Sequence, residues 1–138
     1  MADNRTERQR SETMRAVRGK DTGPEWFVRR LLHGMGYRYR LHDSRLPGKP
    51  DLVFAGRRKA IFVHGCFWHA HGCDYGQPPK SRLEYWLPKL EANQLRDREQ
   101  ANKLRRLRWS VCTVWQCETL RPERLTRKLQ RFLDGPES

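Results

Sequence analysis

Apolar positions in the first half of the chain predict one helix followed by three short strands. Thr22 can cap a helix in which apolar residues recur at helical spacing, and Gly36 ends it. Three later runs, which alternate or are almost wholly apolar, are typical of strands: 37–41, 51–54 and 59–64. The last two runs are separated by four residues, which would form a hairpin turn.

The second half of the chain predicts a long helix, one more strand and a closing helix. Ser81 and Glu84 have the spacing of a capping box, and the long helix that follows contains Pro88, which would kink or divide it. Residues 109–115 form a further apolar run, and residues 122–133 carry apolar positions at helical spacing. This order of elements implies an α/β fold with a small mixed β-sheet flanked by helices.

The chain divides into a polar N-terminal segment and one domain. Residues 1–20 are rich in arginine, and a short helix over 12–18 could be capped by Ser11. A segment this polar cannot bury itself, so we expect an arm that orders on a partner, with Met14 as its apolar contact. Residues 21–138 have a length that suits a single domain with one core.

The charge of the chain indicates a polyanionic partner. Its 138 residues carry 29 Lys and Arg against 16 Asp and Glu, a formal net charge of +13. Guanidinium groups bind phosphate in a bidentate way, so this excess favours nucleic acid over a basic protein without a specific partner. No run of about 18 apolar residues could span a membrane, and the first residues lack the apolar segment of a secretory signal. We therefore expect a cytoplasmic, nucleoid-associated protein whose four cysteines are metal ligands or free thiols.

Ligand-type side chains are concentrated in residues 64–73. Cys66, His71 and Cys73 stand there with C-x4-H-x-C spacing, and two thiolates with one imidazole select zinc over magnesium. Spacing alone leaves open whether His71 or His69 is the ligand. The alternative is that these are buried free cysteines and surface histidines without a metal.

A fourth ligand would have to come from elsewhere in the chain. Cys117 follows a predicted strand end, from which a loop can reach the first three ligands. Cys112 lies inside that strand and fits a small core residue. A site closed by Cys117 would be tetrahedral with no open position, and such a site holds a loop and does no chemistry itself.

Acidic and imidazole side chains near the predicted strand ends could support phosphodiester hydrolysis. Asp51 opens one central strand and could hold Mg2+ beside a phosphate, while His64 closes the neighbouring strand. His69 could activate water or protonate the leaving oxygen, oriented by Asp97 of the long helix. Each residue also has an ordinary interpretation: Asp51 as a turn residue, Glu25 as the acid of a capping box, and Asp97 as a surface acid paired with an arginine.

Two consecutive aromatic residues, Phe67 and Trp68, fall in the loop that zinc would hold, and Trp86 begins the long helix. Such side chains could stack on or insert between DNA bases, as apolar wedges do in proteins that distort DNA. Alternatively, Trp86 and one of the pair cover the core. The other tryptophans fit the periodicity of their elements and are predicted to be core residues: Trp26, Trp109 and Trp115.

Together these residues resemble the very-short-patch repair (Vsr) endonuclease family, a group of bacterial DNA mismatch nucleases. The resemblance runs over nearly the whole chain and is carried by Met14-Arg15-Ala16, Leu46-Pro47-Gly48-Lys49-Pro50-Asp51, His64-Gly65-Cys66-Phe67-Trp68-His69, Cys73, Glu84-Tyr85-Trp86, Asn93 with Arg96-Asp97-Arg98, and Val114-Trp115-Gln116-Cys117. The string His-Gly-Cys-Phe-Trp-His is highly specific, whereas Pro-Asp alone is not.

The resemblance implies a restriction-endonuclease-like core with catalytic Mg2+ and structural Zn2+. Members nick one strand of double-stranded DNA 5′ of the thymine in a T:G mismatch. Their targets arise by deamination of 5-methylcytosine in DNA methyltransferase sites. We also expect a monomer, with mismatch-repair proteins as candidate partners.

Residue roles follow from the resemblance by position. Asp51 would be the metal-binding carboxylate, and the main-chain carbonyl of Val63, where members often have threonine, would also contact Mg2+. The remaining catalytic residues would be His69 as general base, Asp97 as its orienting acid, and His64 with Glu25 to complete the site. The zinc ligands would be Cys66, His71, Cys73 and Cys117. The DNA contacts would be Phe67, Trp68 and Trp86 in the major groove, Met14 from the minor-groove side, and Lys89 and Asn93 at the mismatch.

One departure concerns the acidic-x-Lys ending that most nucleases of this fold carry. Phe62-Val63-His64 stands in its place, which favours a histidine-based mechanism. Two alternative functions are a non-catalytic zinc module that binds nucleic acid, and a sequence-specific restriction nuclease. The restriction nuclease would need no intercalating wedge and would usually need a dimer to cut both strands.

Overall fold

Four strands form one mixed sheet in this computed structural model, which describes residues 22–69, 71–73, 76–77 and 81–135. The elements follow in the order α2 (Gly23–Gly34), β1 (Arg40–Leu41), β2 (Leu52–Phe54), the 3₁₀ helix η1 (Ala55–Arg57), β3 (Lys59–His64), α3 (Leu83–Arg106), β4 (Ser110–Trp115), the 3₁₀ helix η3 (Gln116–Leu120) and α4 (Pro122–Asp134). The predicted α/β class, with a small mixed sheet flanked by helices, is confirmed. The predicted arm and its helix, with Met14, lie outside the described residues.

The directions of the strands place several strand ends together. The sheet has the order β1-β2-β3-β4, in which β2 runs antiparallel to both β1 and β3, and β4 runs parallel to β3. His64 at the end of β3 therefore lies opposite Trp115 at the end of β4. At the same end, the His42 N–H donates to the Asp51 carbonyl at 3.2 Å, which extends the pairing of β1 with β2.

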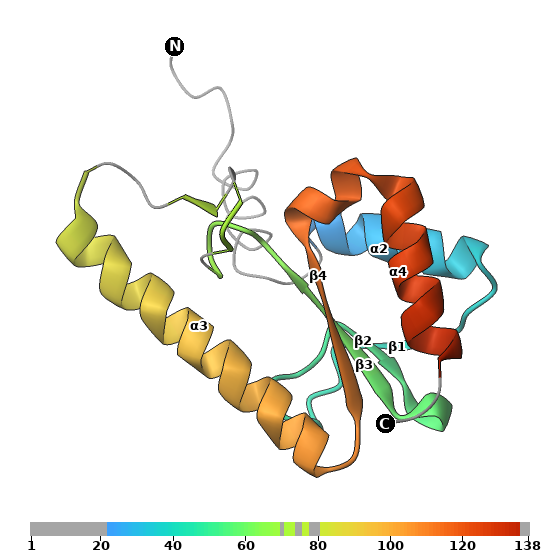
Figure 1. The fold of residues 1–138 in the computed structure, drawn as a ribbon. Coiled ribbons are helices and arrows are strands. Elements are labelled where there is room, and N and C mark those ends of the chain that lie inside the picture. The colour runs from blue at the N-terminus through green and yellow to red at the C-terminus, as the bar shows by residue number, and fades with distance from the viewer. Residues whose placement is uncertain (1–21, 70, 74–75, 78–80, 136–138) are drawn as a thin grey trace, which may run out of the picture.

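The two faces of the sheet are covered by different helices, with α2 and α4 on one side and α3 on the other (Figure 1). Alternating strand residues supply both interfaces, as expected for a sheet buried on its two faces. The core against α2 and α4 contains Val28, Leu32, Leu52, Phe54, Ile61, Val63, Val114, Leu125, Leu129 and Leu133. The smaller core beside α3 contains Ala60, Phe62 and Leu104, with Leu46, Trp109 and Val111 packed against it.

Helix α2 begins as the sequence predicts, because the Thr22 hydroxyl accepts from the Glu25 N–H at 3.2 Å. Trp26 contradicts its predicted place in the core, since it is 50% exposed. Trp26 precedes the buried Val28 by two residues, which is a rotation of about 200° around the helix axis. Its side chain therefore lies on the opposite side of the helix from the core. Its ring instead lies 4.6 Å from the Arg29 guanidinium.

The strand predicted over 37–41 forms only at Arg40 and Leu41. These two residues pair with Val53 and Leu52 of β2, which is itself only three residues long. Tyr39 would stand opposite Phe54, the last residue of β2, but the strand pairing recorded between β1 and β2 ends at Arg40 and Val53. The two tyrosines before β1, Tyr37 and Tyr39, pack edge-on against the ring of Phe54.

Helix α3 is one continuous helix of 24 residues, so of the two effects predicted for Pro88, a kink or a division, the division is wrong. A proline in the second turn removes a single backbone hydrogen bond, and the burial of Leu90 and Leu104 beyond it favours continuation of the helix. The predicted cap by Ser81 is also wrong. Arg82, in the left-handed conformation with φ of 57°, occupies the N-cap position without a side-chain cap.

No helix in the part of the chain that the structure describes is long and apolar enough to cross a membrane.

The turn before β2 packs tightly against α3 through Gly48. Its φ is +75°, and a Cβ at this position would lie 2.7 Å from the Gln100 Cβ and 3.1 Å from the Phe62 Cζ. Both the backbone conformation and the space therefore require glycine. This contact fixes the path of the chain into Pro50 and Asp51 relative to α3.

We predict that Gly48→Ala lowers the free energy of unfolding by about 1–3 kcal/mol, from left-handed backbone strain and overpacking against α3. Urea unfolding monitored by tryptophan fluorescence would measure the change. Gly56→Ala is the matched control, because nothing lies within 4 Å of a Cβ at Gly56 and its φ is not positive. Equal stability of the two variants would contradict this account of the turn.

Candidate active site and metal centre

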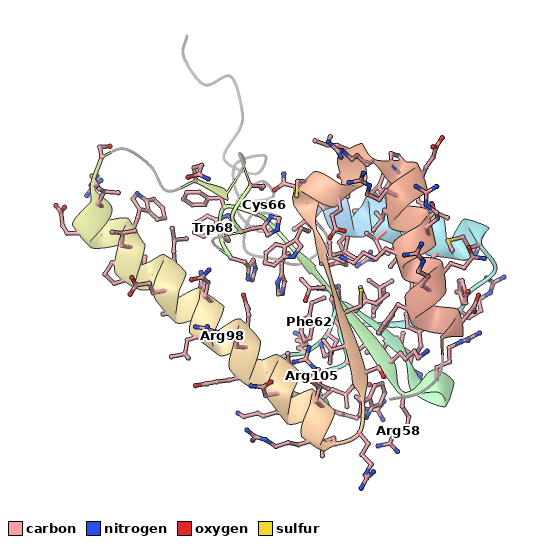
Figure 2. All side chains as sticks on the ribbon, in the orientation of Figure 1. Arg58, Phe62, Cys66, Trp68, Arg98 and Arg105 are labelled. Atoms are coloured by element: carbon pink, nitrogen blue, oxygen red, sulfur yellow. The ribbon has the colours of Figure 1, made fainter. Side chains whose placement is uncertain are left out.

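Three groups of potential ligands gather at the end of the sheet where β3 and β4 end. In each group the ligand-type atoms lie within 4.8 Å of one another. The groups are Cys66, His71, Cys73 and Cys117; His64, His69 and Asp97; and Glu25, His42 and Asp51. The structure therefore brings together all the side chains that the sequence nominated as zinc ligands or catalytic groups, and adds His42. Figure 2 labels Cys66 beside η3, and Trp68 on the side toward α3.

The cysteine and histidine group joins the loop after β3 to the start of η3. The Cys117 N–H donates to the Cys66 sulfur at 3.4 Å, and the Cys117 sulfur lies 3.6 Å from His71 Nδ1. Within the loop, the His71 N–H donates to the Cys66 carbonyl at 2.9 Å. Cys112 stays outside this group and packs against the larger core, as predicted.

A short polar network holds the chain where β4 passes into η3. The Glu118 carboxylate accepts from the Trp115 N–H at 2.9 Å and from the Lys128 ammonium at 2.8 and 2.9 Å. Lys128, on α4, also donates to the Thr113 carbonyl at 2.7 Å. Helix α4 thereby fixes the position from which Cys117 reaches the loop.

The chemistry of this group suits a soft or borderline cation. Burial raises the pKa of the Cys66 thiol to about 12, and burial also raises the pKa of Cys117. These thiols would stay protonated at neutral pH unless a cation replaced their protons. Three sulfurs and one imidazole provide four ligands, the number that closes a tetrahedral site.

The second group pairs two histidines with an acid from α3. His69 Nδ1 lies 2.5 Å from Asp97 Oδ2, and the His64 ring stacks on the His69 ring at 3.8 Å with an interplanar angle of 4°. His64 Nδ1 is 3.9 Å from the same Asp97 oxygen and has no hydrogen-bond partner among the described residues. Asp97 therefore pairs with His69, and not with a neighbouring surface arginine as its alternative interpretation held.

The third group places two carboxylates and a histidine in a buried position. Glu25 gives its N–H to the helix cap, but its carboxylate is buried against the Arg29 guanidinium and the His42 ring. His42 Nε2 lies 2.9 Å from Glu25 Oε2 and 3.8 Å from Asp51 Oδ1. The other oxygen of Asp51 accepts from the Val63 N–H at 2.7 Å. This last contact gives Asp51 a direct tie to β3.

Burial shifts the proton affinity of two of these groups. It raises the pKa of Asp51 to about 6, although the Val63 N–H and the His42 ring oppose the rise. Burial, and then the neighbouring His69, lower the pKa of His64 to about 4, so this ring is neutral at pH 7. Strongly shifted groups close together in one place are a feature of active sites.

The three aromatic residues nominated as a wedge contact one another. The Phe67 ring lies 5.1 Å from Trp68 and 5.3 Å from Trp86, and the two tryptophans are 5.9 Å apart. All three are partly buried, and neither core cluster of the described residues contains them. Asn93 ties the loop to α3, because its amide donates to the Trp68 carbonyl at 2.8 Å.

Trp115 contradicts its predicted role as a core residue. It is partly buried, stacks on His71 at 4.1 Å with an interplanar angle of 11°, and meets His64 edge-on at 5.4 Å. The reason is the parallel register, which sets Trp115 beside His64 at the reactive end of the sheet. The Trp115 ring therefore lies between the sulfur-rich group (Cys66, His71, Cys73 and Cys117) and the stacked pair of His64 and His69, and it contacts both.

Sequence reasoning missed Arg29 and His42. Arg29 follows Glu25 by four residues, a spacing that often marks a helical ion pair and could have been noticed. His42 carried no such signal, because its place opposite Asp51 depends on the strand register.

Comparisons with known proteins find relatives that match nearly the whole chain. A family model described as DNA mismatch endonuclease Vsr matches residues 2–75. The chain is 52% identical over 134 residues to a type II nicking enzyme, V.XorIIP, of Xanthomonas oryzae, which covers 97% of this chain and 98% of that protein. It is 41% identical over 140 residues to the DNA mismatch endonuclease Vsr of Escherichia coli, with 98% and 90% covered. A nicking enzyme of Neisseria meningitidis, V.NmeAIP, is 38% identical over 139 residues, with 98% and 99% covered.

Proposed function

The chain belongs to the Vsr family of DNA mismatch endonucleases and is a DNA endonuclease, and we propose that it nicks one strand of duplex DNA 5′ of the thymine in a T:G mismatch. The observation that carries the proposal is the contact of 2.5 Å between His69 Nδ1 and Asp97 Oδ2. The Val63 N–H that binds Asp51 directly precedes His64, whose ring stacks on His69, so Asp51 lies beside the two histidines. A histidine oriented by an acid, next to a metal-binding carboxylate, can support the attack of water on a phosphodiester.

His69 is the general base in this mechanism. With Nδ1–H donating to Asp97, Nε2 keeps its lone pair and can take a proton from the attacking water. The neutral His64 ring stacked on His69 restricts how that ring can turn. His64 could also donate a hydrogen bond to a phosphate oxygen or to the leaving oxygen.

The group around Asp51 has the donor chemistry of a Mg2+ site. Asp51 and Glu25 supply carboxylate oxygens, and the buried Glu25 Oε1 has no hydrogen-bond partner among the described residues. Asp51 and the main-chain carbonyl of Val63 would hold the ion, with Glu25 completing the site. When bound, Mg2+ would offset the charge that develops on the phosphoryl oxygens. The Val63 N–H keeps Asp51 Oδ2 engaged, which leaves Oδ1 as the oxygen for the ion.

Zn2+ is proposed for the group of Cys66, His71, Cys73 and Cys117. Three thiols and one imidazole select zinc and leave no open position, so the ion would be structural. It would hold the loop after β3 against η3. His69 and the two loop aromatics lie between its ligands in the sequence, so this loop carries both the base and the wedge.

The aromatic group of Phe67, Trp68 and Trp86 is proposed to enter the major groove beside the mismatch. A T:G wobble should cost less to distort than a sound pair, so a wedge favours mismatched DNA. Lys89 and Asn93 stand one and two turns after Trp86 on α3 and would contact the mismatch. Met14, outside the described residues, would enter from the minor-groove side.

A line of cations runs along α3 beside this wedge. Lys89, Arg96 and Lys103 recur every seven residues, which places them along one side of α3, and Arg82 stands at the N-cap of the helix. All four side chains are exposed. The Arg82 and Lys89 charges flank the Tyr85 ring at 5.4 and 4.7 Å. We propose that this line follows the DNA backbone away from the mismatch, which gives the excess of basic residues a specific use.

The proposed biological target is the mismatch that deamination of 5-methylcytosine leaves in a DNA methyltransferase site. The protein would act where chromosomal DNA is found, as a monomer, with mismatch-repair proteins as candidate partners. One cut in one strand needs one active site, which agrees with the monomer.

The function is tested with Mg2+ and two labelled duplexes that differ only in one T:G or C:G pair, set in several methyltransferase-site contexts. We expect a single nick 5′ of the thymine, only in the mismatched duplex. Asp51→Ala should lower the rate at least about a hundredfold, because the metal-binding carboxylate is lost, while DNA binding persists. Binding without cutting in every context would favour the zinc module, and double-strand cuts in both duplexes would favour a restriction nuclease.

The zinc assignment predicts about one zinc per chain by metal analysis. Cys73→Ser should lose the metal and lower the thermal unfolding midpoint by 10 °C or more, on the order of a lost structural site. Cys112→Ala is the matched control, since that thiol lies outside the group, and it should keep the metal. A stable wild-type protein without metal would contradict the assignment.

The line of cations predicts a specific change in salt dependence. Removing two charges with Arg96→Gln and Lys103→Gln should weaken binding to matched and mismatched duplexes alike, and reduce the slope of log affinity against log salt by roughly 2. Fluorescence anisotropy over a salt series measures both. Arg105→Gln, about 200° from Lys103 around α3, is the control for a lost charge and should leave the slope unchanged. A loss of slope per removed charge that is equal for Arg105→Gln and for the Arg96 and Lys103 substitutions would contradict a defined path of the DNA backbone along α3.

A further inference from the structure

His42 takes no part in the mechanism above, yet it is held in a backbone conformation that few residues adopt. Its φ is 47°, in the left-handed region. It directly follows β1, and its N–H donates to the Asp51 carbonyl at 3.2 Å, so the two residues face each other across the sheet end. Left-handed conformations at residues other than glycine gather at functional sites, where surrounding contacts outweigh the strain.

The ring that this conformation directs inward lies between two buried carboxylates. Glu25 is fully buried and Asp51 is 7% exposed. Nε2 of His42 lies 2.9 Å from Glu25 Oε2, within hydrogen-bond range, and 3.8 Å from Asp51 Oδ1, beyond it. Two carboxylates this close would repel each other or share a proton unless a donor lay between them.

The two oxygens of Asp51 are therefore in different situations. Oδ2 accepts from the Val63 N–H at 2.7 Å, and Oδ1 faces the His42 ring without a hydrogen bond to it. The Glu25 carboxylate, anchored by Arg29 and His42, is kept from turning onto Asp51. The arrangement leaves Oδ1 free to act as a ligand.

We propose that His42 is a positioning residue for strand cutting: Nε2 holds Glu25 apart from Asp51 and so keeps Asp51 Oδ1 directed at a divalent cation. The inference rests on the proposed function only in giving Asp51 the role of metal ligand. It adds a residue that no motif of the sequence marks. In this proposal His42 acts through the position of a single atom, Nε2, which contacts Glu25.

This dependence on one atom allows a pair of matched substitutions. The amide nitrogen of glutamine reaches about as far as Nε2 of histidine, whereas that of asparagine ends near the place of Nδ1. Both side chains are neutral amides, and asparagine tolerates the left-handed backbone better than glutamine does. A purely structural role would thus favour His42→Asn, and the positioning role favours His42→Gln.

The test compares wild type, His42→Gln and His42→Asn in two measurements. Binding of Mn2+ to the zinc-loaded chain without DNA is followed by the loss of the free-ion signal in electron paramagnetic resonance. Cutting of the T:G duplex is followed in single turnover at saturating DNA. Arg58→Asn, at another left-handed residue with φ of 54° in the turn between β2 and β3, controls for the backbone change. The thermal unfolding midpoint is recorded for every chain.

We expect His42→Asn to bind Mn2+ at least tenfold more weakly and to cut at least tenfold more slowly than wild type, with an unfolding midpoint no lower than that of His42→Gln. His42→Gln should stay within threefold in both measurements, and Arg58→Asn should match wild type. Wild-type values for His42→Asn, or equal losses in both His42 variants, would overturn the inference. Failure of the wild type to cut any mismatched duplex would instead reject the proposed function, and the Mn2+ comparison would still decide the role of His42.

Discussion

The pairing of β3 with an antiparallel strand on one side and a parallel strand on the other determines where the reactive groups of this chain can meet. Because β2 runs against β3, the residue before β2 lies at the end of β3; because β4 runs with β3, the two strands end together. Asp51, His64 and Trp115 share one end of the sheet for this reason alone. The opposite end holds the hairpin between β2 and β3 and the Lys59 ammonium, which donates to three carbonyls at the end of α4.

Burial gives the polar groups at this end their properties, and it also makes them depend on one another. A buried carboxylate is stable only when donors surround it. Glu25 obtains such donors from Arg29 and His42, and Asp51 obtains one from β3. Removing any one donor leaves a buried acid with too few partners, so this region acts as a unit. Under the proposed function, a divalent cation would add positive charge beside Glu25 and Asp51.

The sequence predicts the fold well where the signal is local. The Thr22 cap, the apolar central strands and the amphipathic helix α4 are each visible in residues a few positions apart. The members of the three groups of potential ligands, except His42, were also recognisable, because they are clustered in the sequence or match a family pattern. What could not be predicted depends on register and backbone geometry: Trp115 beside the histidines, Trp26 on the exposed side of its helix, and His42 opposite Asp51.

The loop between Cys66 and His71 shows how a structural ion could control a reaction without touching substrate. Both ends of this short segment belong to the sulfur-rich group, and between them lie Trp68, tied to α3 by Asn93, and His69, paired with Asp97. The segment thus contacts α3 at two points, and with zinc bound as proposed its two ends would also be fixed. Helix α3 carries both the proposed DNA contacts and Asp97. Any shift of that helix on DNA binding would therefore move Asp97, which orients the proposed base His69. Substrate recognition and base orientation would then be coupled through a single helix.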